Sequence, residues 1–172
     1  RRVVELGSGC GLAGLAFMLK GARVTLTDLS EVTKALTSQN ANAVYKRALT
    51  SWQGGSTLHE PTVEPIDWTC EYAAPTEGAF DIVLLTDCIF SSVLTPHLIR
   101  QIKRLAGKNS EIICCHEIRD VEANDSFLAA LAEICTIRRI QQSKLHPEFS
   151  SNLINVVIAK PRRKKGGAAR AV

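Results

Sequence analysis

One short stretch near the start of the chain restricts its possible folds more than any other. The apolar segment Val3–Leu6 runs into the sequence Glu5-Leu-Gly7-Ser-Gly9-Cys-Gly11-Leu12, and apolar residues then recur at helical spacing up to Leu19. A strand, a glycine-rich turn and a helix in this order predict a βα unit. Because glycine carries no side chain, a ligand can approach such a turn closely, and the amides at the start of the helix face it.

The rest of the chain alternates strand-like and helix-like segments. This predicts an α/β fold with a mostly parallel sheet and helices on both faces. The expected strands are residues 3–6, 23–27, 62–66, 80–85, 111–115, 136–140 and 153–159, with a loop at 50–61. Because no helix separates the last two strands, we expect them to pair antiparallel. No repeat or linker divides the chain, so we predict one domain over residues 1–160.

Three further helices are expected, each starting at a polar residue that can cap it. Ser30 is the candidate cap of the second helix, Thr95 of the third, and Asn124 or Asp125 of the fourth. Their apolar positions are Val32, Ala35, Leu36 and Ala43 in the second, Leu98, Ile99, Ile102 and Leu105 in the third, and Phe127, Leu128, Leu131 and Ile134 in the fourth. Gly107 is expected to end the third helix.

The glycine loop admits two classes of cofactor. The stretch from Gly9 to Gly14 matches the GxGxxG pattern of dinucleotide-binding domains. Glu5, however, stands just before Gly7, and a carboxylate there would repel a pyrophosphate. It suits a cationic amino-acid ligand such as the methionine part of S-adenosylmethionine. Asp28 ends the second expected strand, where a carboxylate can accept hydrogen bonds from the ribose hydroxyls of either cofactor.

A tryptophan after the third expected strand adds to the case for S-adenosylmethionine. In Asp67-Trp68 the aromatic ring can flank an adenine, although Trp68 could equally be a partly buried packing residue. Taken together, Glu5, the three glycines of the loop and Trp68 favour S-adenosylmethionine over NAD.

Composition and cysteine usage limit where the chain works. No apolar run is long enough to span a membrane, and no secretion leader opens the sequence. The chain begins directly with a strand, so we expect further sequence upstream. Cys88, Cys114, Cys115 and Cys135 lie in apolar surroundings without a CxxC pair, which favours buried free thiols over disulfides or a metal site. Reduced thiols are typical of the cytoplasm or the nucleus.

Positive charge gathers at the end of the chain. Six cations lie from Lys160 onward, and without them 15 of the 21 basic residues remain against 17 acids. The core is therefore not a nucleic-acid binder by charge. Residues 161–172 are expected to form a disordered, solvated tail, with a nuclear-localisation or RNA-contacting patch as the alternative.

Five motifs, in this order, resemble the seven-strand, non-SET protein-lysine methyltransferases over nearly the whole chain. They are Glu5-Leu-Gly-Ser-Gly-Cys-Gly-Leu, Thr27-Asp28-Leu29, Asp67-Trp68, Thr86-Asp87-Cys-Ile-Phe90 and Cys115-His-Glu117-Ile-Arg119. The resemblance is strongest to the branch that acts on the valosin-containing AAA ATPase. Related branches act on chaperones and elongation factors. The resemblance implies a Rossmann-like class I methyltransferase with a seven-stranded sheet in the order 3-2-1-4-5-7-6 and strand 7 antiparallel.

The resemblance also implies the site. The candidate cofactor residues are Glu5, Gly7, Ser8, Gly9, Gly11, Asp28, Leu29, Asp67, Trp68 and Thr86, and the cofactor is S-adenosyl-L-methionine without a metal. Asp87 is expected to face the methyl-acceptor pocket. The family favours tyrosine where Phe90 stands, but a calmodulin-directed branch carries phenylalanine. A tryptophan-bearing segment usually precedes the first strand in the family, and it is absent from this sequence. The expected partner is a protein substrate, a chaperone, AAA ATPase or elongation factor, bound by a monomer.

The chemistry of methyl transfer gives the acceptor-side residues their roles. A lysine nucleophile must be neutral, although its reference pKa is about 10.4, and a nearby positive sulfur lowers that pKa. Asp87 could hold the incoming ammonium and Phe90 could form an aromatic wall for it. Asp87 could instead cap a turn. Glu117 is either a second substrate-binding acid or a solvated loop residue. His97 and His116 are expected to be structural or surface residues.

Two other functions stay open from the sequence. One is a methyltransferase that acts on RNA or a small molecule, because a fold does not fix a substrate. RNA base-amine enzymes often carry prolines after the fourth strand, which residues 87–90 lack. The other is a cofactor-binding module without activity, against which the intact glycine loop and Asp28 argue.

Overall fold

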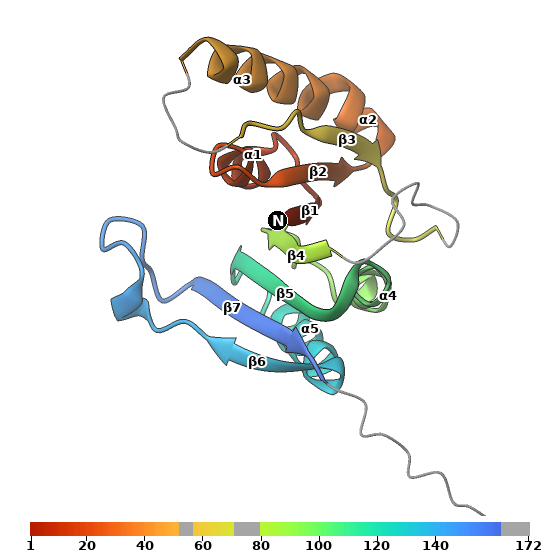
Figure 1. The fold of residues 1–172 in the computed structure, drawn as a ribbon. Helices are drawn as coiled ribbons and strands as arrows, with labels where there is room; N and C mark the ends of the chain where they lie inside the picture. Colours follow the sequence, from red (N-terminus) through yellow and green to blue (C-terminus); the bar gives the residue numbers. More distant parts are fainter. Residues whose placement is uncertain (52–56, 71–79, 163–172) are drawn as a thin grey trace, which may run out of the picture.

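Seven strands form a single sheet in the computed structural model, which describes residues 1–51, 57–70 and 80–162 (Figure 1). The strands are β1 (Arg2–Leu6), β2 (Arg23–Asp28), β3 (Thr62–Pro65), β4 (Phe80–Thr86), β5 (Ala106–Glu117), β6 (Cys135–Arg139) and β7 (Ile154–Pro161). Their order is β3-β2-β1-β4-β5-β7-β6. β7 pairs antiparallel with β5 and β6, and the other pairs are parallel. The predicted strand order and the antiparallel strand are confirmed.

Helical segments lie between the strands. They are α1 (Leu12–Met18), α2 (Ser30–Val32), the π-helical turn η1 (Thr33–Thr37), α3 (Ser38–Ser51), the 3-10 turn η2 (Ser92–Leu94), α4 (Thr95–Leu105), α5 (Val121–Ile134) and the 3-10 turn η3 (Gln142–Lys144). In the described part of the chain, none of these helices has both the length and the apolar character needed to cross a bilayer.

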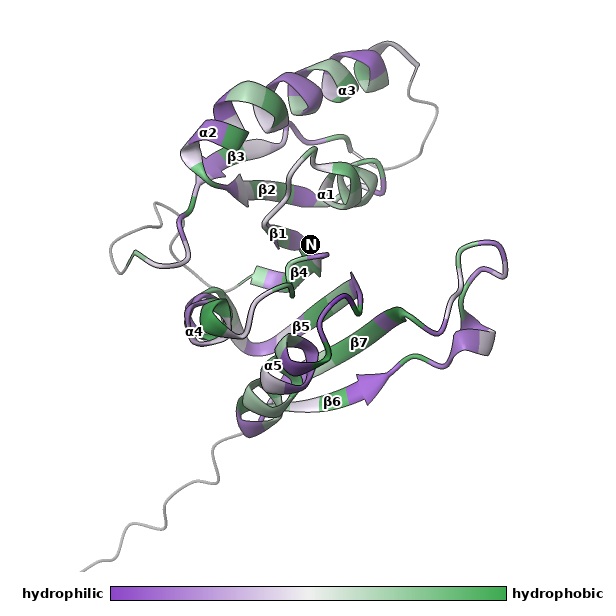
Figure 2. Ribbon diagram, turned by 180° about the vertical axis from the view of Figure 1, so that it is seen from behind, coloured by the Kyte–Doolittle hydropathy of each residue, from purple (hydrophilic) through white to green (hydrophobic). Residues whose placement is uncertain are grey.

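The two faces of the sheet carry separate cores because successive strand residues point to opposite sides. On one face, Val4 and Val83 pack with α4 and α5, including the fully buried Phe127. On the other face, Val3 and Leu84 pack with α1 and α3. Figure 2 shows apolar residues along β5 and β7 and mixed polarity on the helices. Helices therefore cover both faces, as the alternating pattern predicts.

The second expected helix buries a different set of residues from the predicted one. Ala35, Leu36 and Ala43 are exposed, whereas Thr33 and Thr37 are buried. The cause is η1, a turn with one residue more than an α-helical turn, which rotates the residues on either side of it relative to each other. A strict 3.6-residue spacing cannot anticipate this shift.

The capping predictions are wrong. Ser30 and Thr95 are the first helical residues, so Leu29 and Leu94 occupy the cap positions of α2 and α4. The cap of α5 is Asp120, whose carboxylate accepts a hydrogen bond from the Ala123 amide at 3.0 Å. Each helix therefore begins earlier than expected relative to its polar residue.

The ends of two other elements also differ. α4 ends at Leu105 and β5 begins at Ala106, so Gly107 lies in a strand and does not end the helix by itself. β7 continues to Pro161, and the Arg162 amide donates to the Ile134 carbonyl at 2.9 Å. The rest of the expected tail, residues 163–172, lies outside the described residues.

Candidate active site

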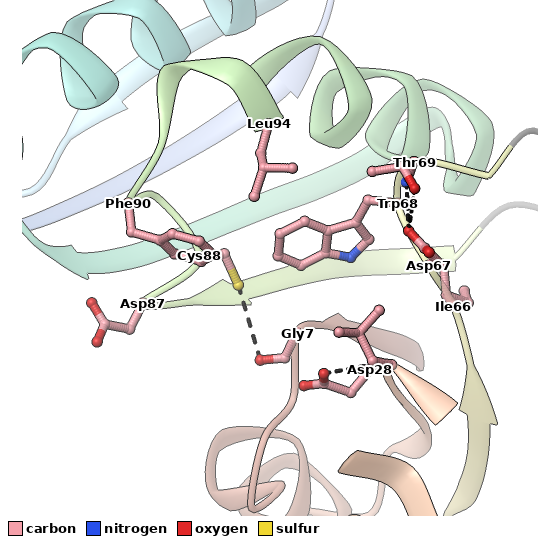
Figure 3. Close-up of a pocket in the computed structure, with 11 residues that line it drawn as sticks. Gly7, Asp28, Ile66, Asp67, Trp68, Thr69, Asp87, Cys88, Phe90 and Leu94 are labelled. Carbon is pink, nitrogen blue, oxygen red and sulfur yellow. Dashed lines mark hydrogen bonds between the residues drawn. The ribbon is translucent and has the colours of Figure 1, made fainter. Parts of the chain in front are cut away.

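The carboxyl ends of β1, β2, β3 and β4 surround a cavity of about 380 Å³ (Figure 3). This volume is within the range of small-molecule sites. The lining residues are Gly7, Asp28, Leu29, Ile66, Asp67, Trp68, Thr69, Asp87, Cys88, Phe90 and Leu94. Residues from four segments far apart in the sequence therefore meet at the edge where parallel sheets bind ligands.

The glycine loop has a backbone that only glycine adopts easily. Gly7, Gly9 and Gly11 have φ values of 64°, 50° and 82°, all in the left-handed region. A Cβ on Gly7 would lie 2.8 Å from the Cys88 sulfur and 2.9 Å from Trp68 Cζ2. Gly7 is thus glycine for two independent reasons, its conformation and the approach of the Trp68 ring.

Gly14, the last glycine of the GxGxxG match, has a packing role. A Cβ there would lie 2.3 Å from Leu26 Cδ2 and 2.7 Å from Glu5 Oε2. The pattern that resembles a dinucleotide fingerprint is explained at this position by close contact between α1 and the sheet.

Glu5 lies beneath the loop and does not line the cavity. Its side chain is fully buried, and its two carboxylate oxygens accept from the Gly14 amide at 2.9 Å and the Thr86 hydroxyl at 2.8 Å. Burial raises the pKa of Glu5, and these two hydrogen bonds act in the opposite direction. The contact with Thr86 ties the end of β4 to the glycine loop, so both residues support the site from below.

Asp28 lines the cavity and braces the loop. Its Oδ2 accepts from the Gly9 amide at 2.7 Å, and its Oδ1 accepts from the Leu29 amide at 2.8 Å. A carboxylate offers about four acceptor positions, so each oxygen keeps capacity for a ligand hydroxyl. Asp28 is therefore placed to bind a ribose while holding the loop that faces it.

Trp68 lies inside the cavity with its ring between Leu94 and Gly7 (Figure 3). Its backbone carbonyl accepts from the Arg100 side chain at 3.0 Å, which fixes the segment after β3 onto α4. Beside it, Asp67 accepts from the amide and the hydroxyl of Thr69 at 2.8 and 2.6 Å, and these bonds lower the pKa of Asp67. The ring is both a packing residue and a wall of the cavity.

Asp87 stands at the cavity rim in a conformation that is unusual for its residue type. Its φ is 56°, and its amide donates to the Cys115 carbonyl at 2.8 Å. Figure 3 shows its carboxylate turned away from Trp68 and Asp28, on the same side of the cavity as Phe90. The carboxylate forms an ion pair with Arg119, a partner that the sequence reasoning did not assign.

Of the predicted site residues, the structure brings seven to the cavity wall and places five elsewhere. Gly7, Asp28, Leu29, Asp67, Trp68, Asp87 and Phe90 line it. Glu5, Ser8, Gly9, Gly11 and Thr86 lie in or under the adjoining loop and strand ends. Cys88, Ile66, Thr69 and Leu94 line the cavity without having been predicted; the first three adjoin predicted residues, and Leu94 lies four residues after Phe90.

A buried polar network lies behind the end of β5. His116 is 2% exposed and its Nε2 is 2.9 Å from the Asn124 side-chain oxygen, which also accepts from Asn155 at 3.2 Å. The Cys114 sulfur is 3.6 Å from His116 Nδ1. Burial raises the pKa of the Cys114 thiol. His116 is structural, as predicted.

All six cysteines are free; Cys88, Cys114 and Cys135 are buried and Cys115 is half-buried.

The residues around the cavity fit S-adenosylmethionine. The cradle at Gly7 excludes any side chain, Asp28 offers acceptors for a ribose, and Trp68 with Ile66 gives an apolar wall for adenine. Among the described residues, the buried Ser8 hydroxyl beside the cavity has no hydrogen-bond partner.

The fold and this site define a Rossmann-like domain of the S-adenosylmethionine-dependent methyltransferase class. A TehB-like SAM-dependent methyltransferase from Corynebacterium glutamicum superimposes with a TM-score of 0.62 at 15% identity, covering 94% of this chain and 80% of that one. Residues 1–134 match the family model described as lysine methyltransferase, and the chain belongs to this family. The choice of S-adenosyl-L-methionine over NAD is thereby confirmed.

Two curated relatives show the same kinship. The protein is 26% identical over 140 residues to the protein N-lysine methyltransferase METTL21A of Danio rerio, covering 81% of this chain and 60% of that protein. It is 27% identical over 127 residues to the EEF1A lysine methyltransferase 3 of Xenopus tropicalis, covering 74% and 51%. The chain thus spans about 60% or less of the length of these two relatives.

Proposed function

We propose that the protein transfers a methyl group from S-adenosylmethionine to the side-chain amine of a lysine in a protein substrate. One observation carries the proposal: Asp87 and Phe90 line the same cavity as Gly7, Asp28 and Trp68, so an acid and an aromatic ring stand beside the cofactor residues. The two relatives are named for lysine methylation of proteins, which supports a lysine acceptor.

The residues divide the task between two sides of the cavity. When bound, the cofactor supplies an electrophilic methyl group on a positively charged sulfur. Asp28 and Trp68 orient its nucleoside, and the loop at Gly7 admits it closely to the backbone. On the acceptor side, Asp87 binds the ammonium of the incoming lysine and Phe90, 51% exposed, shields its alkyl chain and cation. Alignment of the amine with the methyl is the main catalytic contribution of the protein.

The partner belongs, on this proposal, to the chaperones, AAA ATPases or elongation factors, with the AAA ATPase branch first. The name of the Xenopus relative gives EEF1A as the substrate of that protein. We also propose a cytoplasmic location, with the nucleus as an addition, which the free cysteines support. On this proposal the protein acts as a monomer.

Replacing Asp87 tests the acceptor role without altering the backbone. Asn and Gly both tolerate the left-handed conformation that Asp87 adopts. We expect Asp87→Asn to keep affinity for S-adenosylhomocysteine within a few-fold, and methyl transfer to fall about a hundredfold. Asp87→Gly, which also removes the side chain, should fall at least as far.

The assay uses tritiated S-adenosylmethionine and a cell extract whose protein, RNA and small-molecule fractions are counted separately. Label in methyl-lysine of protein supports the proposal. Label in RNA or small molecules supports the alternative acceptors, and a wild-type protein that binds cofactor but labels nothing supports a binding module. Unchanged turnover in folded Asp87→Asn would reduce Asp87 to a turn residue.

A further inference from the structure

An ion-pair cluster joins the ends of β4 and β5 at the rim of the cavity. The Arg119 guanidinium contacts the Asp87 carboxylate through Nη2 and Oδ2, and its Nε lies 3.3 Å from Glu117 Oε2. The three side chains are 45 to 55% exposed, so water and a substrate can reach them. Glu117 is the last residue of β5 and Arg119 follows it by two residues, and the proposed reaction has so far given neither of them a role.

We propose that Arg119 is a positioning residue of the acceptor site, which holds the Asp87 carboxylate in the orientation that receives the lysine. This inference rests on the proposed function. Arg119 does not line the cavity, so it acts on the substrate only through Asp87.

The two oxygens of Asp87 are held unequally. Oδ2 is paired with Arg119, whereas Oδ1 has one long contact, 3.4 Å from the Glu117 amide. A hydrogen bond at that distance is weak compared with the usual 2.9 Å. Oδ1 is therefore the oxygen with capacity for an incoming amine, and the Arg119 contact decides where it points.

The backbone under Arg119 is fixed from both sides. The Ile118 amide donates to the Leu153 carbonyl at 2.7 Å, and the Arg119 amide donates to the Glu117 carbonyl at 3.0 Å. Asp120 then caps α5. A rigid turn can place a long side chain reproducibly, which a positioning role requires.

The charge of the cluster suits a cationic acceptor. Asp87 and Glu117 carry two negative charges and Arg119 one positive charge, so one negative charge remains at the rim for an ammonium group. Such complementarity guides the approach of a partner more than it tightens binding. Arg119 also keeps the two carboxylates from repelling each other while the site is empty of substrate.

A double-mutant cycle tests the inference. We expect Arg119→Ala to lower methyl transfer at saturating extract by about the hundredfold typical of a misplaced reacting group, close to the effect of Asp87→Asn. The double variant should be little worse than either one, because the two residues act as a unit. Arg119→Lys should recover part of the loss, since it keeps a charge but lacks the planar fork.

Binding and a matched variant separate this from a structural effect. Lys160→Ala removes an exposed cation from the ion pair with Glu111, which lies in the middle of β5 with its Oε1 3.1 Å from Lys160 Nζ, and should leave every measurement at the wild-type value. S-adenosylhomocysteine affinity and Tm should stay unchanged in Arg119→Ala, because half-exposed ion pairs contribute little stability. If the wild type is active, full activity in Arg119→Ala would overturn the positioning role and leave the proposed function standing. The same holds if the activity losses of the two single variants multiply in the double variant. Absence of lysine labelling by the wild type would overturn the proposed function, and this inference with it.

Discussion

Replacing Gly7 by alanine tests whether the glycine loop is built against the Trp68 ring. The new Cβ would lie 2.8 Å from the Cys88 sulfur and 2.9 Å from Trp68 Cζ2, with φ at +64°. Two costs follow. A left-handed backbone costs alanine about 1–2 kcal/mol. Forcing a methyl group into packed surroundings costs about 1–3 kcal/mol more.

Gly9→Ala is the matched control. Gly9 also has a left-handed φ, +50°, but a Cβ there would meet nothing within 4 Å among the described residues. It therefore bears the first cost alone. For a domain of this size, 1 kcal/mol shifts Tm by about 2–4 °C. We expect Gly9→Ala to lower Tm by about 2–8 °C, and Gly7→Ala to lower it by at least about 2 °C more.

Thermal unfolding followed by circular dichroism, without ligand, measures both shifts. Calorimetric titration with S-adenosylhomocysteine then shows whether the displaced Trp68 ring weakens the cofactor site. Adding Cys88→Ala to Gly7→Ala removes the atom nearest to the new methyl group, so part of the extra loss in Tm should be recovered. Equal Tm losses in Gly7→Ala and Gly9→Ala would refute the packing argument.

Three other substitutions test neighbouring contacts. Asp28→Ala removes the acceptor beside Gly9. Because charge-assisted hydrogen bonds contribute about 1.5–3 kcal/mol, titration calorimetry should show a roughly tenfold to hundredfold loss in S-adenosylhomocysteine affinity. An unchanged Kd in a folded variant would remove Asp28 from the site. Burial raises the pKa of Glu5 above 4.5, so the stability it contributes as a neutral acid is lost as pH rises through that raised pKa. Glu5→Gln buries no charge, so its Tm relative to wild type should increase as pH rises above 4.5, and a constant difference would contradict the assignment. Asn124→Ala leaves His116 and Asn155 without their shared acceptor, which should cost about 1–3 kcal/mol in a urea unfolding series, whereas a neutral result would mean that water replaces the amide.

Much of the fold was predictable because its strands are buried on both faces. Runs such as residues 80–85 are almost continuously apolar, and their length and spacing indicate parallel strands. Helix starts were not predictable from one polar residue. Thr95 is buried, and Asp120 lies four residues before the expected cap Asn124, which is instead held by His116. Whether a polar residue caps a helix or enters the core depends on contacts that the sequence does not display locally.

The candidate site shows the same division. Asp28, Trp68 and Asp87 follow strands, and strand ends meet at one edge, so their presence at the cavity could be inferred. The role of Glu5 could not be inferred, because the alternation of side chains along β1 decides that its carboxylate points under the loop. Arg119 was visible as a cation two residues after the fifth strand, but its pairing with Asp87 needs the adjacency of β4 and β5.

The π-helical turn at Thr33–Thr37 adjusts the spacing between two fixed attachments. Before it, the chain is anchored at the end of β2; after it, the Thr37 hydroxyl donates to the Gly9 carbonyl at 2.7 Å and Asn40 donates to the Cys10 carbonyl at 3.0 Å. Removing one residue from the turn would leave a regular α-helix, but rotate one part about 100° relative to the other. Either the Thr37 hydroxyl would then lose its contact with the Gly9 carbonyl, or the chain would no longer connect to the end of β2. A relative whose α2–α3 segment is one residue shorter therefore has to be aligned with its gap inside this turn, and a graft of this helix onto another domain has to carry the extra residue with it.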